Sequence, residues 1–114
     1  PTVLLDPPAD AKVSHSEIFG PVVNVHSYDS LDQAIAMSNA LPFAFQSSVF
    51  TSNIDVAMRC VREIEAAAVM VNDHTAFRVD WMPFAGHQHS GYGTGGMRYT
   101  MHDMTAEKLV VVKL

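Results

Sequence analysis

The sequence VMVNDHTAFRVDWMPFAGHQHSG, residues 69–91, joins a short apolar run to a long segment of chemically versatile side chains. The run ends at Asn72, and the residues after it include Arg78, two aspartates, three histidines, the only Trp and two Phe. A connection of about twenty residues is uncommon in a compact domain unless it is functional or disordered, and its aromatic residues argue against disorder. We therefore expect a scaffold that presents this segment as a binding loop.

Composition is that of an ordinary globular domain and argues against several classes of partner. Of the 114 residues, 48% are hydrophobic and 17% are charged, which is enough apolar material for one core. The net charge of -5 argues against a nucleic-acid partner, because such proteins carry a basic patch. No apolar run is long enough to span a bilayer, so we expect no membrane partner. The single Cys60 excludes an internal disulfide framework and fits a reducing, cytoplasmic compartment.

Upstream of residues 69–91, patterns typical of strands and helices alternate. Apolar or β-branched runs predict strands at residues 2–5, 22–28, 45–51 and 67–72. Ser30 and Gln33 have the spacing of a capping box, and Ser52 is expected to cap a second helix. The apolar stripe of that helix is expected to be Ile54, Ala57, Met58, Val61 and Ile64. Strands joined through helices imply parallel pairing, so the predicted fold class is α/β, a parallel-sheet layer with flanking helices.

The chain after the loop is expected to end in a helix and a strand. Residues 91–96 are rich in glycine and predicted to be flexible, and residues 97–104 have a helical pattern. Residues 107–114 end in LVVVKL, and so apolar a strand needs cover on both faces, from a partner chain or from further sequence. Because the chain begins at Pro1 without a Met, we expect it to be part of a longer protein, with a single domain over residues 1–114.

Short sequence blocks along the chain occur in a familiar order. They are Pro1–Leu4, Glu17–Val22, Asn39–Phe43, Val49–Thr51, Val71–Asn72, Pro83–Gly86 and Ser90–Gly93. Together they resemble the aldehyde dehydrogenase superfamily over essentially the whole chain. The resemblance implies that residues 1–114 are the C-terminal portion of the catalytic domain, with residues 107–114 as a terminal assembly strand. It also implies a homodimer or homotetramer that uses NAD or NADP.

The activity implied by the resemblance is oxidation of a small-molecule aldehyde to a carboxylic acid through a cysteine thioester, with hydride passing to NAD(P). In the family the nucleophile and the glutamate base lie upstream, so we expect no catalytic residue in these 114 residues and no activity from them alone. Cys60 matches no family motif and is expected to be a small core residue. The alternative function is a non-catalytic interaction module that pairs with another chain through residues 109–112.

The resemblance also implies roles for particular side chains. Glu17 and Phe19 match positions that contact the nicotinamide end of the cofactor, where a carboxylate accepts hydrogen bonds from ribose hydroxyls. Phe84 matches an aromatic residue of the aldehyde tunnel, and Phe77 and Arg78 lie in the substrate loop. The alternative for each is structural, a turn or core position.

Residues 72–80 resemble family members that oxidise small polar or anionic aldehydes, and a guanidinium suits carboxylate, phosphate or sulfonate groups. A structural alternative for Arg78 is an ion pair with Asp73 or Asp80 that braces the loop. His87 and His89 supply only two ligands without a third, so no metal site is predicted. Gln88 stands where the family usually has Lys, and Thr94 and Gly95 stand where it has Arg-Glu. No contact of that turn is therefore carried over.

Overall fold

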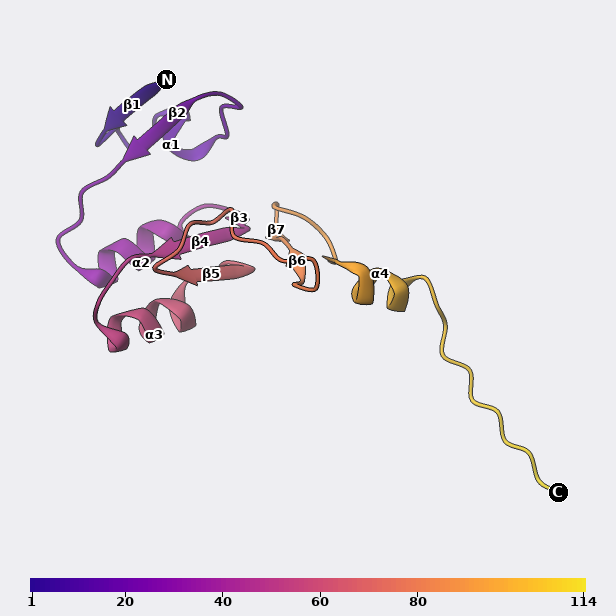
Figure 1. Cartoon of the computed structure of the whole chain (residues 1–114). Helices are drawn as coiled ribbons and strands as arrows, with labels where there is room; N and C mark the ends of the chain where they lie inside the picture. Colours follow the sequence, from indigo (N-terminus) through magenta and orange to yellow (C-terminus); the bar gives the residue numbers. More distant parts are fainter. The chain divides into compact units, whose positions relative to one another are not determined.

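A computed structural model describes all 114 residues and divides them into two compact units, residues 1–41 and 42–114 (Figure 1). The first unit contains β1 (Thr2–Leu5), α1 (Lys12–His15), β2 (Val22–Val25) and α2 (Leu31–Asn39). The second contains β3 (Phe43–Ala44), β4 (Gln46–Val49), α3 (Ile54–Glu63), β5 (Ala68–Val71), β6 (Phe84–Ala85), β7 (His87–Gln88), β8 (Thr94–Gly95) and α4 (Met97–Asp103). None of the four helices has the length and apolar character that a membrane crossing requires.

In the first unit β1 pairs in parallel with β2, from Thr2 beside Val22 to Leu5 beside Val25. The strand expected over residues 22–28 stops at Val25, and the short helix α1 lies between β1 and β2 in the sequence. The predicted cap of α2 is present, since the Ser30 hydroxyl accepts a hydrogen bond from the Gln33 backbone N–H at 3.2 Å. The reciprocal bond differs from the predicted capping box, because Oε1 of Gln33 accepts from the backbone N–H of Asp29, at 2.7 Å, and not from that of Ser30.

The ends of β1 and β2 are tied together by Asp6. Its backbone is left-handed, with φ of 44°, and its N–H donates to the Val25 carbonyl at 2.7 Å. Its carboxylate accepts from the backbone N–H of Ser27 at 2.6 Å and from the Ser27 hydroxyl at 2.9 Å. The backbone bond first, and then the hydroxyl bond, lower the pKa of Asp6, because both favour the ionised form.

In the second unit β4 and β5 form another parallel pair, from Gln46 beside Ala68 to Val49 beside Val71, with α3 between them in sequence and against β5 (Figure 1). Parallel strands joined through helices confirm the α/β class. The parallel layer consists of two separate two-stranded pairs, β1 with β2 and β4 with β5.

The expected cap of α3 was wrong, and its expected apolar stripe was only partly right. The side chain that caps it is Asn53, which accepts from the N–H groups of Asp55 and Val56, and Ser52 makes no such bond because the chain enters the helix one residue later. Of the expected apolar stripe, Ala57 is buried and Ile64 is partly buried, whereas Ile54, Met58 and Val61 are exposed. Cys60 is buried beside Ala57, so the helix packs through its small side chains. Cys60 is 3% exposed, which confirms it as a core residue.

The long segment after β5 carries three very short strands. β6 pairs with β8 through Phe84 beside Gly95, and β3 pairs with β7 through Phe43 beside Gln88, both antiparallel. Within the glycine-rich residues 91–96, which were predicted to be flexible, Thr94 and Gly95 form β8. The helix expected at residues 97–104 is confirmed as α4.

Residues 105–114 form neither helix nor strand and are exposed. The terminal strand expected at residues 107–114 is therefore absent from the single chain, because a strand exists only where a neighbouring strand accepts its backbone hydrogen bonds. Its part in assembly stays a prediction.

Candidate functional site

The turn between α1 and β2 lines a cavity of about 430 Å³ in the first unit. Glu17 and Phe19 lie on this turn, together with Ile18 and Gly20, so both residues expected at the cofactor belong to one cavity. The helix before the turn, α1, ends at His15, and the turn closes where the Val22 N–H donates to the Gly20 carbonyl at 2.8 Å. The turn therefore places a carboxylate and an aromatic ring two residues apart at one opening.

Phe19 has an unusual backbone conformation. Its φ is 48°, in the left-handed region that bulky residues rarely adopt, and its side chain is 91% exposed. Such strain costs on the order of 1–3 kcal/mol and is concentrated at ligand sites. The ring is thus held away from the core of its unit, where it is free to contact a bound molecule.

Asn24 also lines this cavity and was not identified from the sequence. Its side-chain Nδ2 donates to the Val13 carbonyl, so it ties β2 to α1 across the base of the Glu17 turn. Its Oδ1 is buried and has no partner within the chain. The only available signal was an amide within the otherwise β-branched run Val22–Val25.

In the second unit the structure brings Arg78 and Phe84 together. The guanidinium carbon of Arg78 lies 4.6 Å from the centroid of the Phe84 ring, a cation–π distance. Phe45 meets the same ring edge-on, with centroids 5.2 Å apart and planes at 89°. Phe45, just before β4, was expected only as a strand residue, and its role here depends on a contact between distant parts of the sequence.

The ion pair considered for Arg78 is absent. Asp73 accepts from the backbone N–H of His74 at 2.8 Å, and neither Asp73 nor Asp80 pairs with Arg78. A guanidinium that lies over an aromatic face keeps its N–H edge available for an anion. The arrangement can therefore bind a small anionic group beside an apolar surface.

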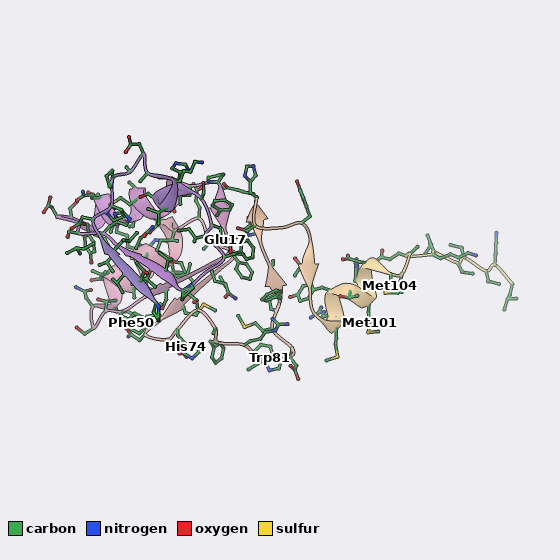
Figure 2. The ribbon with its side chains drawn as sticks, turned by 90° about the horizontal axis from the view of Figure 1, so that it is seen from above. Glu17, Phe50, His74, Trp81, Met101 and Met104 are labelled. Atoms are coloured by element: carbon green, nitrogen blue, oxygen red, sulfur yellow. The ribbon has the colours of Figure 1, made fainter.

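The remaining loop residues lie outside this contact. Phe77 is about half exposed, its N–H donates to the His74 carbonyl at 3.1 Å, and it takes part in neither ring contact. Trp81 and His74, labelled in Figure 2, are both exposed. His89 packs its ring edge-on against Phe43 at 6.2 Å, and no group of three or more His, Cys, Asp or Glu side chains is placed to hold a metal ion.

Comparisons with known proteins place these features in context. A model of the aldehyde dehydrogenase family matches residues 1–110. The 3-sulfolactaldehyde dehydrogenase of Priestia megaterium is 40% identical over 114 residues, which are 100% of this chain and 24% of that protein. The chain thus spans about a quarter of the length of the curated relatives it matches.

Solved structures of aldehyde dehydrogenases share the fold of this chain. Aldehyde dehydrogenase 21 from Physcomitrella patens, in complex with the reaction product succinate, superposes with a TM-score of 0.84 at 35% identity, over 90% of this chain and 21% of that one. A mutant indole-3-acetaldehyde dehydrogenase of P. syringae, in complex with NAD⁺ and IAA, superposes with a TM-score of 0.88 at 28% identity, over 98% and 22%. The matched family model, the sequence identity and the shared fold lead to one conclusion: this chain belongs to the aldehyde dehydrogenase family.

Proposed function

We propose that residues 1–114 are the C-terminal part of the catalytic domain of an NAD(P)-dependent aldehyde dehydrogenase, which oxidises a small anionic aldehyde to a carboxylic acid. The proposal is supported by the family membership of the chain and by its relatives of about four times its length. The observation that supports an anionic substrate is the Arg78 guanidinium on the Phe84 ring.

The cofactor contact is assigned to Glu17 and Phe19. The cavity they line is open, Glu17 is exposed, and the strained Phe19 backbone presents its ring outward. A carboxylate accepts hydrogen bonds from two neighbouring ribose hydroxyls, and an aromatic ring packs on the nicotinamide. NAD or NADP, when bound, supplies the hydride acceptor, while these two side chains orient it.

The substrate contact is assigned to Arg78, Phe84 and Phe77. Arg78 has no carboxylate partner in the chain, so its outer N–H groups are available to a substrate anion. The name of the Priestia relative includes a sulfonated aldehyde, and the Physcomitrella structure contains the dicarboxylate succinate. We therefore propose an aldehyde that carries a sulfonate or a carboxylate at its far end.

The covalent step is assigned to residues outside this chain. Cys60 is the only cysteine, and at 3% exposure its thiol has no access to an aldehyde. We propose that a cysteine nucleophile and a glutamate base are supplied by the rest of the polypeptide, and that residues 1–114 alone form no NAD(P)H.

The test uses the full protein encoded by the reading frame that contains this sequence. Rates of NAD(P)H formation are compared for succinate semialdehyde and the uncharged butanal. Arg78→Gln should raise KM for succinate semialdehyde by about 10–100-fold, since a charged hydrogen bond contributes roughly 1.5–3 kcal/mol. KM for butanal should stay within about twofold. Arg98→Gln, which removes an exposed cation from α4, is the matched control. Equal losses on both aldehydes would refute the anion-binding role.

A second variant tests the cofactor contact separately. Glu17→Gln should raise KM for NAD(P) by about tenfold with the aldehyde KM unchanged, because the amide loses the charge that strengthens its hydrogen bonds to ribose hydroxyls. Glu107→Gln, an exposed residue of the C-terminal segment, is the control. An unchanged KM for NAD(P) would remove Glu17 from the cofactor site.

A second candidate function, an interaction module, is favoured by the exposed apolar run at residues 109–112. An uncovered run of this kind marks an interaction surface, and it is proposed to add as a strand to the sheet edge of another copy. Deleting residues 107–114 should convert a dimer or tetramer to monomer in sedimentation. Val111→Pro, which removes a backbone donor, should weaken assembly, and Val111→Thr should not. Unchanged sedimentation after the deletion would contradict the assembly role.

A further inference from the structure

Asn72, the first residue after β5, is bound to the backbone of Thr51 by both ends of its side chain. Its Oδ1 accepts from the Thr51 N–H at 2.8 Å, and its Nδ2 donates to the Thr51 carbonyl at 2.9 Å. We call these two bonds the Asn72 clamp. The Asn72 backbone is left-handed, with φ of 57°, a conformation that Asn tolerates better than most residues.

The clamp lies at the root of the loop that carries Arg78. The Asn72 N–H extends the β4–β5 ladder by donating to the Val49 carbonyl at 2.8 Å, and the Ser48 hydroxyl donates to the Asp73 carbonyl. Residues 72 and 73 therefore join the start of the loop to the C-terminal end of β4, where the chain turns away from the sheet (Figure 1).

Beyond residue 74 the loop makes only local hydrogen bonds. The N–H of Phe77 donates to the His74 carbonyl at 3.1 Å, and the N–H of Met82 donates to the Val79 carbonyl at 3.0 Å. No hydrogen bond in the structure joins residues 75–83 to another element. Hydrogen bonds to other elements therefore hold this loop only at its two ends, at the Asn72 clamp and at β6.

The same device occurs independently at the other parallel pair. Asp6 follows β1 in the left-handed conformation, and its carboxylate binds the N–H and hydroxyl of Ser27 after β2. In both units a left-handed Asp or Asn uses its side chain to bind the chain just past the neighbouring strand, which sets the direction of the connection that leaves the sheet.

We infer that Asn72 is a positioning residue for the substrate pocket: its clamp sets the direction of residues 73–83 and so holds Arg78 on the Phe84 ring. The consequence for substrate selection rests on the proposed function, but the clamp and its effect on the loop do not.

The first experiment measures the loop directly, by limited trypsin digestion of the full protein encoded by the reading frame that contains this sequence. Trypsin cuts after Arg78 within the loop and after Arg98 within α4, which serves as the internal control. Asn72→Gly keeps the freedom to adopt a positive φ but removes both clamp bonds. It should raise the cleavage rate after Arg78 by about 30-fold, because each lost hydrogen bond changes the opening equilibrium by a factor of about five. The rate after Arg98 should not change.

Asn72→Asp is the conservative variant, since it keeps the acceptor for the Thr51 N–H and loses only the donor. Its cleavage rate after Arg78 should be intermediate. An unchanged rate after Arg78 in Asn72→Gly would overturn the inference. Equal increases after Arg78 and Arg98 would also overturn it, because they indicate general loosening of the chain.

The second experiment uses the full encoded protein. Asn72→Gly should raise KM for succinate semialdehyde about tenfold with kcat within about twofold, and Asn72→Asp should recover part of the loss. If cleavage after Arg78 increases but the unmodified protein oxidises no aldehyde, the clamp stands and the proposed function fails. If the protein oxidises aldehydes but Asn72→Gly changes neither cleavage nor KM, the proposed function stands and the inference fails.

Discussion

Gly86, between β6 and β7, lies so close to the backbone of Ser90 that there is no space for a side chain. A Cβ at residue 86 would lie 2.6 Å from the Ser90 carbonyl oxygen, 2.8 Å from its carbonyl carbon and 3.0 Å from its Cβ. The two nearest atoms belong to the backbone, so no side-chain rotation relieves the overlap and the turn at residues 87–90 must move. Gly86→Ala therefore tests how tightly this turn is built.

The energetic cost follows from what Ser90 holds in place. Its hydroxyl accepts a hydrogen bond from the N–H of Ala44 at 2.9 Å, and Ala44 is only 3% exposed. Overpacking costs about 1–3 kcal/mol, and an unpaired buried N–H adds about 1–3 kcal/mol. Gly86→Ala should therefore lower the free energy of unfolding by about 2–6 kcal/mol.

The assay combines urea unfolding, followed by circular dichroism, with amide hydrogen exchange at Ala44. The Ala44 amide should exchange at least about 30-fold faster in Gly86→Ala, which corresponds to about 2 kcal/mol of lost protection. Ser90→Ala removes the acceptor without creating the overlap. It should therefore lower the free energy of unfolding only by the hydrogen-bond part, about 1–3 kcal/mol.

Gly20→Ala is the matched glycine control. A Cβ there would be no nearer than 3.8 Å to any atom of Ile18, and the substitution should change stability by less than about 0.5 kcal/mol. If Gly86→Ala unfolds within about 0.5 kcal/mol of the unmodified chain and leaves Ala44 exchange unchanged, the reasoning from the Ser90 overlap is refuted.

Three further predictions concern other parts of the chain. The Ser27 hydrogen bonds lower the pKa of Asp6, so its stabilising effect is complete above the usual value of 3.8 and is lost as the pH falls through the lower folded-state pKa. Titration of the Asp6 carboxyl carbon by NMR should give a midpoint below 3.8 that Ser27→Ala raises, and a midpoint at or above 3.8 would contradict this. Asn53→Ala should cost about 1 kcal/mol of stability as a lost helix cap, whereas Ser52→Ala should cost nearly nothing, and equal losses would mean that the cap is misassigned. The Cys60 thiol should react with DTNB about 100-fold more slowly in native buffer than in urea, because it is buried, and equal rates would show that it is accessible.

The α/β class was predictable because it depends on local properties of the chain. Runs of β-branched residues favour extended backbone, and the Ser30–Gln33 spacing satisfies backbone donors at a helix start, whatever the rest of the molecule does. A helix between two successive strands supplies the crossover connection that parallel pairing needs. The resemblance to the aldehyde dehydrogenases likewise rested on short blocks such as Glu17–Val22.

The predictions that were wrong concern positions where neighbouring residues have equal local preferences. Ser52 and Asn53 are both good cap residues, and only the direction from which the chain enters α3 selects Asn53. The apolar residues of α3 cover more than one face, and close packing against β5 selects the small Ala57 and Cys60. Strands of two residues, such as β6 and β8, are too short for any periodicity.

The candidate sites divide in the same way. Arg78 was singled out because a guanidinium in the expected substrate loop suits an anion, and Glu17 because it lies in a block that resembles the family. Their surroundings were decided by tertiary structure. Phe45 precedes α3 in the sequence and packs against the ring of Phe84, which follows it, and Asn72 bonds the backbone of Thr51. Contacts between residues far apart in the chain arise from strand pairing and packing, so they leave no signal in either segment read separately.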